Sequence, residues 1–140
     1  MSSSQSLYTQ IFTRLGTFHP NINRTRLANW VWVIVGLLQA QSVHLSEIAN
    51  HIPGPALAAG RIMKIRRWLS NKHITTQTLY EPIIAHVLSG WIGREVTIML
   101  DGCFVNGEAL QMLRLSLSHC YRALPLAWQV VASVGLVELA

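Results

Sequence analysis

Asp101 is the residue whose type and surroundings most directly suggest chemistry. It is the only aspartate among the 140 residues, and it follows an apolar run at residues 96–100. A carboxylate in an apolar strand is costly unless it is paired or bound to a metal. Two interpretations stay open. Either Asp101 and Gly102 form a turn, or Asp101 is a ligand for Mg²⁺, an ion that prefers oxygen ligands and serves phosphoryl transfer. One aspartate cannot hold two ions, so a two-metal site needs carboxylates from elsewhere.

A basic segment forms the second candidate site. Residues 61–72 carry five cationic side chains, and no acidic residue occurs between Asn50 and Tyr80. Lysine and arginine neutralise phosphates and release counterions from DNA, and such contacts position a protein on the duplex. The candidate DNA-binding residues are Arg61, Lys64, Arg66, Arg67 and Lys72. The alternative is a solvated helix face that happens to be basic.

Other chemistries lack their motifs. The six histidines include no pair at a zinc-binding spacing, and two cysteines are too few for a disulfide scaffold. Neither a G-x-S-x-G motif nor a G-x-x-x-x-G-K-[ST] loop is present. Nucleophilic hydrolysis and nucleotide hydrolysis on a phosphate-binding loop therefore have no support.

The charge divides the chain into two parts. Residues 1–93 contain eight basic and two acidic residues, whereas residues 94–140 contain three basic and four acidic residues. The net charge of the whole chain is +5. We therefore expect a basic helical DNA-binding region at residues 1–90 and a different unit at residues 91–140.

The basic part has helical periodicity and recognisable helix ends. Gly16 is expected to end the first helix, and Asn23 and Ser46 are expected to cap the next two. The expected helices are residues 6–15, 24–40, 47–51 and 56–69, and a last one capped by Thr75 or Thr76 that runs to about residue 88. The order of the elements in residues 38–69 is typical of a helix-turn-helix, in which the basic helix would enter the major groove.

The second part changes to the period of β-strands. Residues 95–100, 110–118 and 122–131 are expected to be strands, because they are apolar or alternate between apolar and polar side chains. Asn106 and Gly107 are a strong hairpin signal, and a tight connection is expected at residues 119–121. Three strands joined in this way form an antiparallel meander, so the fold class is α+β.

Membrane insertion and export have no signal in the sequence. The longest apolar stretch is residues 30–38, less than half of the roughly 20 residues that a spanning helix needs. The first residues lack the basic and apolar regions of a signal peptide. We therefore expect a cytoplasmic protein with no membrane partner.

Three segments together resemble the start of the catalytic domain of IS4-group DDE transposases. They are residues 96–102, residues 113–118, and residues 121–128, which contain Arg-Ala-Leu-Pro-Leu-Ala-Trp. The basic residues 61–71 and the Tyr-Glu-Pro at residues 80–82 are also similar to the N-terminal helical region of that family. The resemblance extends over about residues 24–131.

The resemblance implies an RNase H-like α/β fold whose first three antiparallel strands are present here. It implies that Asp101 is the first catalytic, metal-binding carboxylate, and that Mg²⁺ is the cofactor. The implied partner is DNA at transposon ends, which the family cuts and joins. Cys103 and Tyr121 stand where the family often has threonine and glycine. The second aspartate and the glutamate of the triad lie downstream in the family, so a truncated fragment that is inactive alone is expected.

Two further expectations follow from the same residues. A sheet with an open edge and an uncovered face favours association between copies, so a homo-oligomer is expected. The alternative function is a non-enzymatic DNA-binding module or regulator, whose DNA binding would be indifferent to replacement of Asp101.

Overall fold

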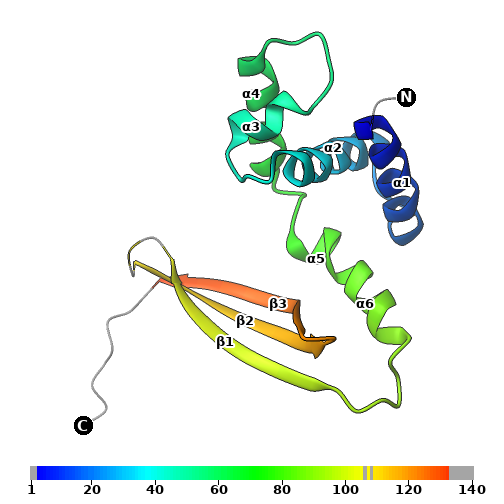
Figure 1. The fold of residues 1–140 in the computed structure, drawn as a ribbon, viewed down its shortest axis with the longest axis vertical. Helices are drawn as coiled ribbons and strands as arrows, with labels where there is room; N and C mark the ends of the chain where they lie inside the picture. Colours follow the sequence, from blue (N-terminus) through cyan, green and yellow to red (C-terminus); the bar gives the residue numbers. More distant parts are fainter. Residues whose placement is uncertain (1–2, 106, 108, 133–140) are drawn as a thin grey trace. The chain divides into compact units, whose positions relative to one another are not determined.

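The computed structural model describes residues 3–105, 107 and 109–132. They form six helices followed by three strands, an α+β arrangement (Figure 1). The chain divides into two compact units, residues 1–90 and residues 91–140. We call them the helical unit and the sheet unit and describe each by itself.

Helices α1 (Ser3–Phe18) and α2 (Arg24–Ala40) form the first half of the helical unit. Asn23 caps α2, because its side chain accepts hydrogen bonds from the backbone N–H groups of Thr25 and Arg26. The expected end of the first helix at Gly16 is wrong, since α1 continues to Phe18. One core cluster joins the two helices, and its buried members are Leu15, Leu27, Val31 and Val35.

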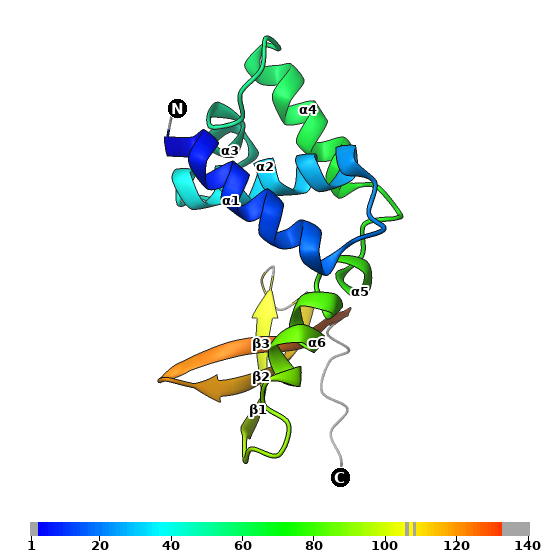
Figure 2. The same ribbon diagram turned by 90° about the vertical axis from the view of Figure 1, so that its right-hand side faces the viewer.

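Helices α3 (Leu45–Asn50) and α4 (Ala58–Leu69) pack on another side of α2. The second core cluster contains Val33, Ile48, Ala49, Ile52 and Ile65. Helix α2 therefore lies between α1 and the α3–α4 pair (Figure 1), and in Figure 2 α1 crosses in front of α2. The expected cap at Ser46 is wrong, because α3 begins at Leu45 and has no side-chain cap. Residues 51–57 connect α3 to α4, a longer link than the roughly three to four residues of a helix-turn-helix.

The last expected helix is divided in two. Thr75 forms a capping box with Thr78 and begins α5 (Thr76–Leu79). A second helix, α6 (Glu81–Ser89), begins after Tyr80 with Pro82 in its first turn. Proline has no N–H group and its ring collides with the preceding turn. A helix that ran through Tyr80 without a break would put this proline in its interior, whereas a new helix accepts it at its start.

The sheet unit contains the expected antiparallel meander. Its strands β1 (Thr97–Val105), β2 (Leu110–His119) and β3 (Arg122–Ala132) are hydrogen-bonded in the order β1-β2-β3. The interpretation of Asp101 and Gly102 as a turn is wrong, because β1 continues through both. The expected turn at Asn106 and Gly107 lies partly outside the described residues, since Asn106 is not among them. Val105 pairs with Leu110.

Apolar side chains are exposed on the sheet. Ile98, Leu100 and Phe104 alternate along β1, and Leu100 is 73% exposed. Leu113 of β2, which pairs with Gly102, is also exposed. Because neighbouring positions alternate between the two faces of a strand, these side chains share one face, and Asp101 lies on the other.

The turn between β2 and β3 places two non-glycine residues in the left-handed region. Cys120 has a φ of 48° and Tyr121 a φ of 60°, while His119 and Arg122 on either side are paired. Two-residue turns of this kind favour Asn-Gly, because both residues tolerate positive φ. The sequence correctly predicts a tight connection here, but Cys120 and Tyr121 are residues for which a positive φ is strained.

Replacing Cys120 by asparagine together with Tyr121 by glycine is expected to stabilise this hairpin by roughly 1–2 kcal/mol. Amide hydrogen exchange in β2 and β3 should then slow about five- to thirtyfold, as NMR on the whole chain can measure. Cys120→Ser is the control, because it removes the thiol and keeps the strain. Equal slowing in that variant would contradict the explanation.

No helix in the described part of the chain is long and apolar enough to cross a membrane.

Candidate nucleic-acid interface

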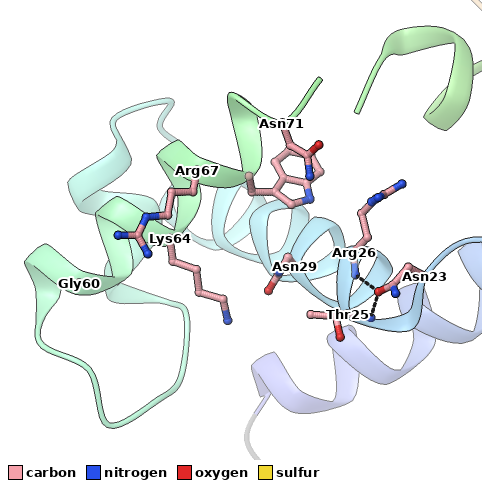
Figure 3. A pocket seen from close by; sticks show the side chains of 9 residues that line it. Asn23, Thr25, Arg26, Asn29, Gly60, Lys64, Arg67 and Asn71 are labelled. Atoms are coloured by element: carbon pink, nitrogen blue, oxygen red, sulfur yellow. Dashed lines mark hydrogen bonds between the residues drawn. The ribbon is translucent and has the colours of Figure 1, made fainter. Parts of the chain in front are cut away.

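The first two turns of α2 and one face of α4 surround a hollow of about 480 Å³ (Figure 3). Its lining residues on α4 and just after it are spaced at helical intervals, so they share one face of the helix. The lining residues are Asn23, Thr25, Arg26 and Asn29 from the α2 segment, and Gly60, Lys64, Arg67, Trp68 and Asn71 from the α4 segment. We call this space the α2–α4 hollow.

Apolar residues of α4 hold this face in place. Ile65 is buried in the second core cluster, and Ile62 and Trp68 pack against that cluster. The burial of Ile65 fixes the rotation of α4, which leaves Lys64 and Arg67 exposed beside it. The cap at Asn23 fixes where α2 begins and thereby places Arg26 in its first turn. In Figure 3 the Lys64 side chain extends from α4 toward Thr25 and Asn29 of α2.

The hollow carries a concentrated and unpaired positive charge. Arg26, Lys64 and Arg67 line it, and no acidic side chain does. Among the described residues the ion pair found lies elsewhere, between Arg114 and Asp101. The N-terminal end of α2 adds the positive end of a helix dipole. An anion in the hollow would therefore lie near three cationic side chains, of which Lys64 extends across the hollow in Figure 3, and would meet no carboxylate from the described lining residues.

Hydrogen-bond donors dominate the remaining wall. The side-chain oxygens of Asn23 and Asn71 already accept backbone N–H groups, those of Thr25, Arg26 and His73. Their amide nitrogens therefore remain as donors. The Nε1 atom of Trp68 is buried and has no hydrogen-bond partner in the described structure. Such an orphaned donor favours a ligand or water that can accept its hydrogen bond.

The structure separates the five residues predicted to bind DNA. Lys64 and Arg67 line the hollow, whereas Arg66 and Lys72 are exposed and do not line it. Arg61 has a different environment, because its guanidinium donates to the backbone carbonyls of Ala49 and Ala56 at 2.9 and 2.8 Å. Arg61 therefore ties the end of α3 and the following loop to the start of α4.

Arg26 is the lining cation that sequence reasoning missed. It lies far from residues 61–72 along the chain, and only the packing of α2 beside α4 brings it to the same hollow as Lys64. Two other arginines are engaged in ring contacts. Arg14 lies 5.9 Å from the ring centre of Phe18, and Arg24 lies at the same distance from that of Phe12.

A neighbouring hollow of about 290 Å³ shares Arg26 and is also lined by His19 and His73. His19 is buried, and this burial lowers its pKa below the ordinary value, while a hydrogen bond with the backbone of Leu79 acts in the opposite direction. His19 is therefore neutral near pH 7 and adds no positive charge beside the α2–α4 hollow.

Asp101 forms an ion pair with the residue directly across the sheet. Its Oδ2 atom lies 3.3 Å from a guanidinium nitrogen of Arg114, and the two side chains are 61% and 43% exposed. Trp128 pairs with Arg114 from the other side, so the three residues form one row across the sheet. An exposed pair of this kind contributes little to stability.

The surroundings of Asp101 do not fit a complete Mg²⁺ site. Its neighbours on the same face are Met99, Cys103, Met112, Arg114 and Ser116. Of these only Ser116 offers an oxygen atom, the kind of ligand that Mg²⁺ prefers. Within residues 3–105, 107 and 109–132, no group of three or more histidine, cysteine, aspartate or glutamate residues could hold a metal. Asp101 can supply one ligand at most.

No protein family model matches the chain, and neither a curated protein nor a solved structure matches it.

Proposed function

We propose that the helical unit binds DNA through phosphate contacts and that the α2–α4 hollow is the centre of the contact surface. The observation that carries this proposal is that Arg26, Lys64 and Arg67 line one hollow and that no acidic side chain among the described residues lines it with them. Exposed Arg66 and Lys72 extend the positive surface beyond the hollow. DNA phosphates are the abundant anions that such an arrangement attracts.

The alternative of a solvated basic face explains less. A solvated face distributes its cations along one helix, where water and counterions surround each of them. Here Arg26 comes from a different helix and lies beside the same hollow as Lys64 and Arg67. Like charges around one hollow repel one another, so the arrangement is more stable when an anion binds among them.

Helix α4 is the element that we place against the duplex. It is long enough to lie in the major groove, which admits an α-helix, and Arg66 and Arg67 stand in its last turn. Helices α2 and α3 support it through the second core cluster. This arrangement is similar to a helix-turn-helix, with the long connection at residues 51–57 as the difference.

A second candidate is the transposase that the resemblance implies. In this proposal β1, β2 and β3 are the first strands of an RNase H-like domain, and Asp101 is one ligand for Mg²⁺. The observation that favours it is the position of Asp101 in the interior of β1 with a carboxylate that is 61% exposed. The bound DNA would then be a transposon end. Because one carboxylate cannot hold two ions, this candidate predicts DNA binding without cleavage by this chain.

The test is a titration of a fluorescent 25-base-pair duplex with the whole chain between 50 and 200 mM salt. Affinity should fall steeply with salt, because each phosphate contact contributes a slope of about −0.9 in log–log form. Lys64→Gln and Arg67→Gln should each reduce the slope by about one unit. Arg14→Gln is the matched control, since it removes the same charge from α1 and should leave the slope unchanged.

Two results would contradict the first proposal: binding that does not respond to salt, or slopes for Lys64→Gln and Arg67→Gln equal to that of the unmodified chain. Addition of Mg²⁺ should produce no nicks, and Asp101→Ala should bind DNA as the unmodified chain does. Cleavage that disappears in Asp101→Ala would overturn the single-ligand role given to Asp101.

A further inference from the structure

The α2–α4 hollow is larger than a phosphate contact requires. A phosphate group on a protein surface needs only a few donors at one point, whereas this hollow measures about 480 Å³. That volume lies within the range of roughly 300–1,000 Å³ that small-molecule and cofactor sites occupy. Space therefore remains for a ring system beside a phosphate.

The wall presents two kinds of donor. Lys64 and Arg67 on α4 are cations suited to a phosphate, and Arg26 adds a third positive charge across the hollow. Asn29 is a neutral donor that also lines the hollow, and Trp68, a further lining residue, has a buried Nε1 atom without a hydrogen-bond partner. Asn29 makes no side-chain hydrogen bond within the described residues. A ligand that satisfies both kinds carries an anionic group next to a planar ring with acceptor atoms.

A nucleotide has this chemistry. Its phosphate would lie on the cations, and the edge of its base would meet Asn29, whose amide can both donate and accept as asparagine does toward base edges. The orphaned Nε1 atom of Trp68 would gain an acceptor, which removes the cost of a buried, unpaired donor. An acidic peptide would satisfy the cations but would offer no planar ring to the two neutral donors.

We infer that the α2–α4 hollow binds a single nucleotide, either free or displaced from the base stack of DNA, with its phosphate on Lys64 and Arg67 and its base edge at Asn29 and Trp68. The displaced form rests on the proposed DNA binding. Unpairing a base costs energy, least where the base is mismatched or already unpaired. DNA with one bulged nucleotide should therefore bind better than the same duplex fully paired.

The experiment compares three probes on the whole chain: a fully paired 25-base-pair duplex, the same duplex with one bulged nucleotide, and 5′-deoxynucleoside monophosphates as competitors. We expect a preference of roughly tenfold for the bulged duplex, the size of one good base contact. Asn29→Ala should abolish this preference, and because asparagine carries no charge the salt slope of the paired duplex should stay the same. Trp68→Phe should act in the same direction, because phenylalanine keeps a ring against the core and removes the N–H.

The outcomes separate the two proposals. Equal affinity for bulged and paired DNA, with no competition from mononucleotides, overturns the nucleotide site while DNA binding stands. Mononucleotide binding that Asn29→Ala removes, without any preference for the bulged duplex, assigns the hollow to a free nucleotide. If polyglutamate competes as well as mononucleotides do, the site recognises only anions and the inference is wrong. If Trp68→Phe does not fold, as circular dichroism would show, Asn29→Ala alone decides.

Discussion

Replacing Gly36 by alanine is expected to destabilise the helical unit by roughly 1–2 kcal/mol, although alanine is the better helix former. A Cβ atom at Gly36 would lie 2.7 Å from Cγ2 of Ile48 and 3.0 Å from its carbonyl oxygen. Ile48 is buried in the second core cluster, so neither group can move without disturbing α3. The collision outweighs the gain of about 1 kcal/mol in helix propensity. Urea unfolding followed by helical circular dichroism measures the change.

Gly60 provides the matched control in α4. A Cβ atom there would meet the Cβ of Ala56 at 3.5 Å, an ordinary contact. Gly60→Ala should therefore stabilise the unit by roughly 0.5–1 kcal/mol through helix propensity alone. The same substitution thus has opposite signs at the two sites. If Gly36→Ala and Gly60→Ala were equally stable, the close approach of α2 and α3 would not be the reason for Gly36.

Local signals predict some helix boundaries and miss others. Helix α2 begins and ends where the sequence predicts, because the Asn23 cap involves only its own first turn. Gly16 does not end α1, since this residue packs toward Leu27 of α2 and the contact between helices outweighs the weak local preference of glycine. The break between α5 and α6 at Tyr80 has a local signal in Pro82, which a prediction from periodicity alone misses.

Only the α4 side of the candidate interface could be predicted from the sequence. The cations of α4 form a run in the sequence, whereas Arg26 joins them through the contact between two helices distant in the chain. No spacing rule connects residue 26 to residue 64. The sequence also could not reveal that the Arg61 guanidinium donates hydrogen bonds to backbone carbonyls. The positions of both acceptors depend on where α3 ends and on the path of the loop that follows it.

The neighbours of Asp101 depend on a register that the sequence left open. A two-residue turn at Asn106 and Gly107 would place Met112 opposite Asp101. The observed pairing of Val105 with Leu110 places Arg114 there instead. A shift of two residues keeps every side chain on its face, so the alternating pattern is satisfied by both registers. The ion pair of Asp101 therefore follows from the loop length and not from the strand pattern.

Replacing Arg61 by methionine is expected to lower the free energy of unfolding of the helical unit by roughly 2 kcal/mol, because two charge-assisted hydrogen bonds are lost and one of them is partly buried. Methionine keeps much of the side-chain length without the donors. Arg61→Lys should recover only part of the loss, since an ammonium group cannot reproduce the forked geometry that reaches the carbonyls of Ala49 and Ala56. Urea unfolding of the three proteins measures these differences.

The same variants distinguish a structural arginine from a DNA-contacting one. If the guanidinium of Arg61 is engaged with the backbone, folded Arg61→Met should bind duplex DNA with a salt slope close to that of the unmodified chain, whereas Lys64→Gln loses about one unit of slope at little cost in stability. If Arg61→Met instead reduced the salt slope by a full unit and left the stability unchanged, Arg61 would be a DNA-contacting residue. The expected result instead makes Arg61 the residue that holds α3 and α4 together, so that Lys64 and Arg67 keep their places around the hollow.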